Sequence, residues 1–596
     1  MRAKRPPAGA VPAGALALVL AVAGLGLSAT QAPATQAPAA PAPASAPASA
    51  PTNSTELTPA DDTLVVTDKG PVRGKAAADH REFLGIPYAS KPARWGSPRP
   101  AAPWSEPRDA TRPGPRCAQS TGVFPNVEPR SESEDCLYLN VTTPRHVRGK
   151  KLPVMVWVHG SGFRNGAGDM YRPQRLADRG EVIVVTVNYR LGLFGFLAHP
   201  ALDGGPARHK SGNFGLEDQQ EALRWVRRNA GAFGGDPSNV TLFGESAGGV
   251  STCSQLASPA AAGLFHRAAV QSGPCLSGTW PDLTGVPDPN GGWLPLARDK
   301  AEKQGRSVAG ALGCTDPATV ARCLRGTPAR EVMAVTEKAE GDLRFTSVAP
   351  VYGGGGLLPE SPAAALAAGR FHKVPVLHGI TRDEFHTFQA VAAHLLQEPP
   401  LTVSAYEARV REFFGEPRAA KVLARYPADR YHGPDETWSK LITDLVFARS
   451  ASDMNHTLAR QVPTYAYQFA DADAPWATDV PAPSFPTRAF HAAELQYQFD
   501  TDYFTGRTLT PDQRHLGDRV IDYWSRFART GDPNGPGAPY WPRADRAPRA
   551  ALSLAPGHDG IRPVDFDRDH DYAFWKSLVA TVTTTVTPTA TPPGRR

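Results

Sequence analysis

Several runs of apolar residues follow one another along the chain, and each has about the length of a strand. Leu152–Val158 contains no polar side chain, and residues 181–187, 240–243, 374–379 and Thr464–Phe469 are mostly apolar. Runs without polar alternation are typical of parallel strands, because crossover helices cover both faces of such a sheet. Helical stretches separate the runs. We therefore predict an α/β protein whose central sheet is mostly parallel and carries helices on both faces.

The two ends of the chain differ in composition from its middle. A basic start, an apolar run over residues 15–27 and small residues after it are typical of a secretory signal peptide. The apolar run is shorter than the ~20 residues that span a bilayer, so we expect removal rather than anchoring. The Ala/Pro-rich stretch that follows and the Thr/Pro-rich end have too few large apolar groups to pack. We predict a signal peptide, a disordered tether, a folded domain and a disordered tail over residues 1–32, 33–60, 61–577 and 578–596, with no integral membrane segment after signal removal.

Composition and charge narrow the class of protein. The chain has 596 residues, of which 41% are hydrophobic, enough for a large buried core. Its 64 basic and 58 acidic residues form no dominant basic block. A nucleic-acid partner would require such a patch, so we expect none.

The motif with the most chemical content follows the run at residues 240–243. Gly244-Glu-Ser-Ala-Gly248 matches the pattern GxSxG, in which a serine occupies a strained turn between a strand and a helix. Only glycine neighbours leave room for that turn. The helix that follows directs its free N–H groups and its positive dipole end toward the space beside Ser246. These features make Ser246 the candidate nucleophile.

The strained turn at Ser246 is called a nucleophile elbow, and two segments before it carry a more specific signal. Gly212-Asn-Phe-Gly-Leu-Glu-Asp-Gln219 and Phe233-Gly-Gly-Asp-Pro-Ser-Asn-Val-Thr241 lead into it. With the elbow, they closely resemble the type-B carboxylesterase and cholinesterase family, and the resemblance extends over residues 63–575. It implies an α/β-hydrolase fold whose long insertions form a substrate gorge, and a catalytic domain that hydrolyses esters.

A second glycine-rich loop follows the run Leu152–Val158. His159-Gly-Ser-Gly-Phe163 is similar to the family's HGGGF, with Ser161 as the middle residue. Acyl transfer places negative charge on a carbonyl oxygen, and backbone N–H groups reach that oxygen best where side chains are absent. We expect the oxyanion donors to be the N–H groups of Ser161, Gly162 and Ala247. The Ser161 side chain is expected either to crowd the loop or to hydrogen-bond within it.

The acid is expected after the strand at residues 374–379. The family places its catalytic acid in an Asp-Glu-Gly, and this maps onto Glu384, with Phe385 in place of the glycine. Asp383 is the alternative, because either carboxylate can orient an imidazole.

The base is expected after one further strand, Thr464–Phe469. His491 is the candidate there. A single histidine among 16 carries little weight, but the order Ser246, Glu384, His491 is the chain order of α/β-hydrolase triads.

Six cysteines in an exported chain indicate disulfides, and spacing alone allows fifteen connectivities. The resemblance implies two pairs, which are Cys117 with Cys136 and Cys314 with Cys323. For Cys253 and Cys275 a third bridge and two buried free thiols both stay open.

Together these observations predict a secreted serine carboxylesterase whose partner is a small-molecule ester. Ser246 attacks the carbonyl, His491 transfers the proton and Glu384 orients the imidazole, so no metal or organic cofactor is needed. Four alternating aspartates at residues 565–571 lack the glycine and glutamate of a calcium loop, and we expect them to be solvated. The alternatives are a lipase acting on long-chain acylglycerols and a non-catalytic binding protein of the same fold. The oligomeric state stays open.

The loop between Cys117 and Cys136 bears on the substrate. In cholinesterases this loop carries a tryptophan for the choline cation, whereas here its only ring is Phe124, which we expect to pack within the loop. Glu128, Glu132 and Glu134 are expected at the surface, where salt screens their charge. We therefore predict neutral esters with short to medium acyl chains as substrates.

Overall fold

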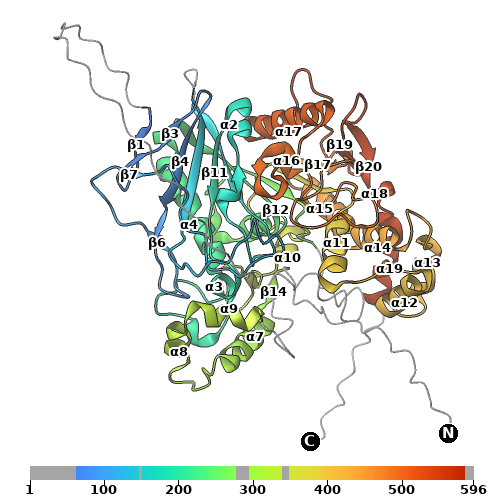
Figure 1. Cartoon of the computed structure of the whole chain (residues 1–596), viewed down its shortest axis with the longest axis horizontal. Coiled ribbons are helices and arrows are strands. Elements are labelled where there is room, and N and C mark those ends of the chain that lie inside the picture. The colour runs from blue at the N-terminus through green and yellow to red at the C-terminus, as the bar shows by residue number, and fades with distance from the viewer. Residues whose placement is uncertain (1–61, 146–150, 277–293, 338–347, 584–596) are drawn as a thin grey trace, which may run out of the picture.

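A computed structural model describes residues 62–145, 151–276, 294–337 and 348–583, and an 11-stranded sheet runs through these residues. The strand order is β20-β19-β17-β16-β13-β12-β9-β11-β8-β4-β3. Strands from β11 to β19 are parallel to their neighbours, whereas the strands beyond them at both ends pair antiparallel. The two ends of the sheet lie at opposite sides of the molecule (Figure 1). The bounds are β3 Lys75–Ala76, β4 His80–Pro87, β8 Tyr138–Pro144, β9 Leu152–Val158, β11 Ile183–Val187, β12 Gly235–Glu245, β13 Arg267–Gln271, β16 Val376–Thr381, β17 Thr464–Phe469, β19 Ala550–Leu554 and β20 Arg562–Asp565.

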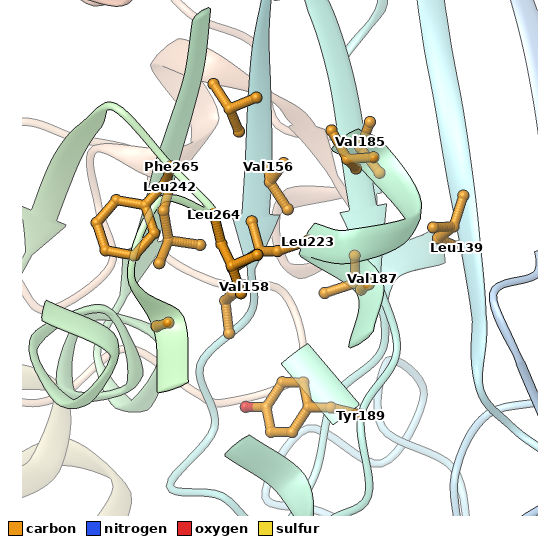
Figure 2. Packing of buried hydrophobic residues seen from close by; sticks show 14 of the residues in the cluster. Leu139, Val156, Val158, Val185, Val187, Tyr189, Leu223, Leu242, Leu264 and Phe265 are labelled. Carbon is orange, nitrogen blue, oxygen red and sulfur yellow. The ribbon is translucent and has the colours of Figure 1, made fainter. Parts of the chain in front are cut away.

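Both faces of the sheet are covered, which confirms the fold class predicted from the apolar runs. Val154, Val156 and Val158 of β9 pack into one core cluster with side chains of α4 (Phe214–Asn229) and α5 (Ala247–Ala257). Figure 2 shows Val156, Val158 and Leu242 of the sheet close to Leu223 of α4. The alternate residues of β9, Met155 and Trp157, pack on the opposite face with side chains of α17 (Pro511–Thr530). Because successive strand side chains point to opposite faces, a fully apolar strand needs a helical layer on each.

The ends of the domain differ in part from the prediction. The described part of the domain begins with a hairpin made of β1 (Leu64–Val66) and β2 (Pro71–Arg73). The last helix, α19 (Tyr572–Thr583), continues beyond residue 577, so residues 578–583 are helical rather than part of a disordered tail. Leu578 is buried in the core, and this contact explains the longer helix. The predicted signal peptide and tether lie outside the described residues.

Among the helices of the described ranges, none combines the length and the apolar composition needed to cross a bilayer. The longest helix described above, α17, has a polar face toward solvent and a buried apolar face, as an amphipathic helix packed on a core does.

All six cysteines form disulfides. The structure pairs Cys117 with Cys136 and Cys314 with Cys323, which are the pairs that the resemblance implied. It also pairs Cys253 with Cys275, so the alternative of two free thiols is not what the structure contains. Cys253 lies in α5 and Cys275 lies just after β13, and the third bridge therefore fastens the helix that follows the elbow to its neighbouring strand.

The third bridge is expected to contribute to stability. Replacing Cys253 and Cys275 together by alanine opens a loop of sequence separation 22 and should lower the free energy of unfolding by about 3 kcal/mol on the chain-entropy model. Denaturant unfolding of the purified protein measures this loss. The matched control is the Cys314→Ala/Cys323→Ala variant, whose bridge has a separation of only 9 and should cost less. An unchanged unfolding midpoint in the first variant would contradict the prediction.

Candidate active site

Ser246 occupies a sharp turn between β12 and α5. Its backbone angles are φ 57° and ψ −122°, a conformation that costs a non-glycine residue on the order of 1–3 kcal/mol. The turn is held by hydrogen bonds from Ser246 N to Gln271 O (2.9 Å) and from Val250 N to Ser246 O (2.9 Å). At Gly248 an added Cβ would lie 1.9 Å from Val158 O, so only glycine lets α5 approach β9 this closely.

Glu384 and His491 form a buried pair on two loops at the same edge of the sheet. Glu384 follows β16, and its Oε2 lies 2.5 Å from Nδ1 of His491. The other carboxylate oxygen, Oε1, accepts a hydrogen bond from Thr381 N (3.0 Å), which fixes the orientation of the side chain. Both residues are buried. A carboxylate bound in this way selects the tautomer that leaves Nε2 free to act as a base.

Asp383 and Phe385, the two neighbours of Glu384, make contacts of their own in the structure. Asp383 contacts Arg382 Nε (3.0 Å) and Ala489 N (3.3 Å) through Oδ2, so its carboxylate is engaged away from the imidazole. Burial opposes its ionisation, but Arg382 and Lys440 outweigh burial and hold the pKa of Asp383 at about 2. Phe385, which replaces the family's glycine, is the first residue of α11 (Phe385–Leu396) and is buried in the core.

The oxyanion loop contains three consecutive residues in the left-handed region, Ser161 (φ 67°), Gly162 (φ 60°) and Phe163 (φ 61°). Within the described residues, no hydrogen bond uses the N–H of Ser161 or Gly162, so both groups are available to a ligand. The loop packs on the elbow, since a Cβ added at Gly160 would lie 3.0 Å from the Ser246 Cβ. Ala247 begins α5, and the first N–H groups of a helix lack partners within the helix.

The carboxylates of Glu245, Glu384 and Glu494 lie around the imidazole of His491, and their negative charges raise its pKa. Glu245, next to the nucleophile, places Oε1 3.1 Å from Nε2 of His491. Burial alone would lower the pKa of His491, but the carboxylates of Glu245 and Glu384 outweigh burial and raise it to about 9. Burial raises the pKa of Glu245 to about 7 and that of Glu494 to about 8. The groups interact strongly enough to titrate as a set.

Ser246 and His491 face one cavity of about 170 Å³. In the part of the chain that the structure describes, no hydrogen bond joins Ser246 Oγ to His491 Nε2, which contacts Glu245 instead. Catalytic hydrogen bonds are often long before a ligand binds. The predicted oxyanion residues Ser161 and Gly162 line the same cavity. Its walls are largely apolar and include seven aromatic rings, which are Phe124, Tyr171, Phe388, Trp476, Phe490, Tyr503 and Phe504.

Sequence reasoning missed several of these residues. Glu128, expected at the surface, is buried and accepts a hydrogen bond from Ser161 Oγ (2.5 Å). Phe124 packs on Tyr503 with ring centroids 5.1 Å apart, but it also lines the cavity, beyond the packing role expected for it. A glutamate beside the nucleophile could have been noticed in the motif itself. The contact between Glu128 and Ser161 joins residues 33 apart, and nothing in the local pattern reveals it.

The strand order, the serine turn after β12 and the candidate acid and base on later loops are those of the α/β-hydrolase class. A model of the carboxylesterase family matches residues 61–575. The chain is 34% identical over 505 residues to a cocaine esterase of Oryctolagus cuniculus, covering 80% of this chain and 87% of that protein. It is also 34% identical over 512 residues to the para-nitrobenzyl esterase of Bacillus subtilis (strain 168), with 82% and 94% covered. A solved thermophilic PNB esterase superposes with a TM-score of 0.69 at 31% identity, covering 86% of this chain and all of that one.

The chain therefore belongs to the carboxylesterase family and is a carboxylic-ester hydrolase. The predictions of family and fold class from the sequence are confirmed.

The charge around His491 predicts a change in pH dependence. Glu245→Gln removes a carboxylate 3.1 Å from Nε2 and should lower the pKa of His491. Because only the neutral imidazole accepts a proton, kcat/KM rises with pH through this pKa, and the acid limb of the profile should move to lower pH. Measuring kcat/KM for a soluble ester from about pH 5 to about pH 10 gives the limb directly.

Glu221→Gln is the matched control, because Glu221 is also buried but lies on α4 and pairs with Arg228 at 3.2 Å. Its acid limb should stay in place. An acid limb that stays fixed or moves to higher pH in Glu245→Gln would show that Glu245 does not raise the pKa of His491.

Proposed function

We propose that the protein is a secreted serine carboxylesterase that hydrolyses neutral carboxylic esters through an acyl-enzyme on Ser246. The single observation that carries this proposal is the 2.5 Å contact between Glu384 Oε2 and His491 Nδ1 at the wall of the cavity that Ser246 also faces. A carboxylate, an imidazole and a strained serine around one apolar cavity are the parts that acyl transfer requires.

The proposed reaction has two halves. Ser246 Oγ attacks the ester carbonyl while His491 Nε2 takes its proton, and the imidazolium then protonates the departing alcohol. Glu384 stabilises the imidazolium through Nδ1. In the second half, His491 takes a proton from water, the resulting hydroxide attacks the acyl carbonyl, and Ser246 recovers its proton as the acid leaves. The N–H groups of Ser161, Gly162 and Ala247 stabilise the carbonyl oxygen as it becomes negative in both halves.

The shape and chemistry of the cavity support the neutral-ester part of the proposal. The lining is mostly apolar and includes seven aromatic rings, which suits an uncharged ester. The carboxylates of Glu128 and Glu245 line it, but both already contact groups of the protein. A cationic substrate would have to compete with those contacts.

Secretion is supported by the cysteines. Three disulfides in one chain persist in oxidising compartments and are rare in the reducing cytosol of mesophiles. The apolar leader seen in the sequence points to the same route of export.

Removing the nucleophile tests the mechanism. Ser246→Ala should lower kcat by on the order of 10⁴- to 10⁶-fold while the protein stays folded, because the triad works as a unit. A fluorophosphonate probe should label wild-type protein at Ser246 and leave the variant unlabelled. Ser254→Ala, also in α5 and buried with its Oγ bound to Val250 O (2.9 Å), is the matched control and should keep both activity and labelling. Labelling at another serine would overturn the assignment of Ser246.

The neutral-ester proposal is tested with two substrates of one shape. We expect kcat/KM for butyrylcholine to exceed that for its uncharged isostere, 3,3-dimethylbutyl butyrate, by less than about tenfold, or ~1.4 kcal/mol. The physical reason is that the carboxylates near the cavity are already engaged. A larger preference for the cation would show that rings such as Trp476 hold a quaternary ammonium, and the substrate assignment would then be wrong.

A further inference from the structure

The side chain of Ser161 belongs to a hydrogen-bonded cluster that the reaction described above does not use. Its Oγ donates to Glu128 Oε1 at 2.5 Å and lies 2.8 Å from the hydroxyl of Tyr503. The Tyr503 hydroxyl in turn lies 2.7 Å from the same Glu128 oxygen. We call these three residues the oxyanion-loop cluster.

The cluster joins three segments that are far apart in the sequence. Glu128 comes from the loop closed by the Cys117–Cys136 disulfide, Ser161 from the oxyanion loop, and Tyr503 from the short turn Asp502–Phe504. Glu128 and Tyr503 are buried, so water competes little for these hydrogen bonds. Backbone contacts hold the cluster from outside, with Glu128 N bound to Phe124 O (2.7 Å) and Thr478 N bound to Tyr503 O (3.0 Å).

Ser161 needs such support because of its backbone. Its φ of 67° lies in the left-handed region, which glycine adopts freely and a residue with a Cβ does not. The N–H groups of Ser161 and Gly162 point in the directions that this conformation sets. A loop that relaxed toward ordinary backbone angles would turn them away from the carbonyl oxygen. Side-chain hydrogen bonds can hold the conformation where backbone preference does not.

We propose that the Ser161 hydroxyl, held by Glu128 and Tyr503, is a positioning group that keeps the backbone N–H donors of the oxyanion loop aimed at the reacting carbonyl oxygen. In this chain the hydrogen bonds of the cluster hold a conformation that a glycine would only permit. The inference rests on the proposed function, because it assumes that the carbonyl oxygen binds between this loop and Ser246.

The first test separates the hydroxyl from the backbone. Ser161→Ala keeps the Cβ and loses the hydroxyl, and should lower kcat/KM by about tenfold to hundredfold, as a small misplacement of oxyanion donors does. The loss should fall mainly on kcat. Ser161→Gly loses the hydroxyl but gains backbone freedom. Its kcat/KM should lie between those of Ser161→Ala and wild type, at least about threefold below wild type. Full activity in Ser161→Gly would overturn the role of the hydroxyl.

The second test asks whether the cluster acts as one unit. Tyr503→Phe should lower kcat/KM severalfold when Ser161 is present and by less than about twofold in the Ser161→Ala background, because the shared contact is then already lost. Glu128→Gln keeps an acceptor oxygen, so its kcat/KM should stay within about threefold of wild type. Glu128→Ala loses the acceptor, and its kcat/KM should be close to that of Ser161→Ala. Equal effects of Tyr503→Phe in both backgrounds would overturn the proposal.

A transition-state analogue supplies a readout that a merely structural role would not move. Ser246 Oγ adds to the carbonyl carbon of a trifluoromethyl ketone while His491 takes the hydroxyl proton, and the oxygen of the adduct carries the negative charge. Across the variants, the inhibition constant of the trifluoromethyl ketone should therefore rise by the same factor by which kcat/KM falls. Inhibition constants that stay constant while activity falls would contradict the proposal.

Matched controls and wild-type protein separate the possible failures. Tyr523 and Ser525 lie on α17 and donate hydrogen bonds to Pro539 O (2.7 Å) and Asp522 O (3.2 Å). Tyr523→Phe and Ser525→Ala remove these hydrogen bonds and should leave kcat/KM and the inhibition constant unchanged. If the proposed function itself fails, wild-type protein will resist the fluorophosphonate and the ketone alike. A wild-type enzyme that reacts with both, combined with unaffected cluster variants, would refute the cluster alone.

Discussion

The close approach of α5 to the end of β9 is the constraint on which the site depends. The helix can begin directly after Ser246 only because Gly248 has no Cβ to meet Val158 O. That approach forces Ser246 into its strained turn, and the bond from Ser246 N to Gln271 O of the next strand holds it there. Strain in one residue is tolerated because the core clusters on both faces of β9 and β12 fix the surrounding backbone.

The parallel sheet then brings the remaining groups together. Parallel strands end at one edge, so the loops that follow β9, β12 and β16 meet there even though these strands end at Val158, Glu245 and Thr381. The base loop is tied to the acid turn by hydrogen bonds, from Asp383 N to Ala489 O (3.0 Å) and from Thr387 Oγ1 to His491 O (3.2 Å). Asp383, the weaker candidate for the acid, thus holds the loop that carries the imidazole.

What the sequence could predict is what local patterns encode. Apolar runs revealed the buried strands, and glycines at 244 and 248 revealed the turn, because each signal lies within a few residues. The ends of elements were less certain, since α19 continues to Thr583 owing to a tertiary contact of Leu578. Glu128 could not be placed, because its burial depends on a tyrosine 375 residues away. The charge set by Glu245 and Glu494 around His491 likewise arises only when separate loops meet.

The Cys253–Cys275 bridge divides the site into two parts of different mechanical character. The elbow helix, with Ser246 and the Ala247 amide at its start, is cross-linked to the loop after β13 at the centre of the sheet. Glu384 and His491 lie on loops that are secured by hydrogen bonds and packing, and none of the three disulfides joins these loops to the helix after Ser246. The alignment of the imidazole with the serine hydroxyl therefore depends on hydrogen bonds and packing.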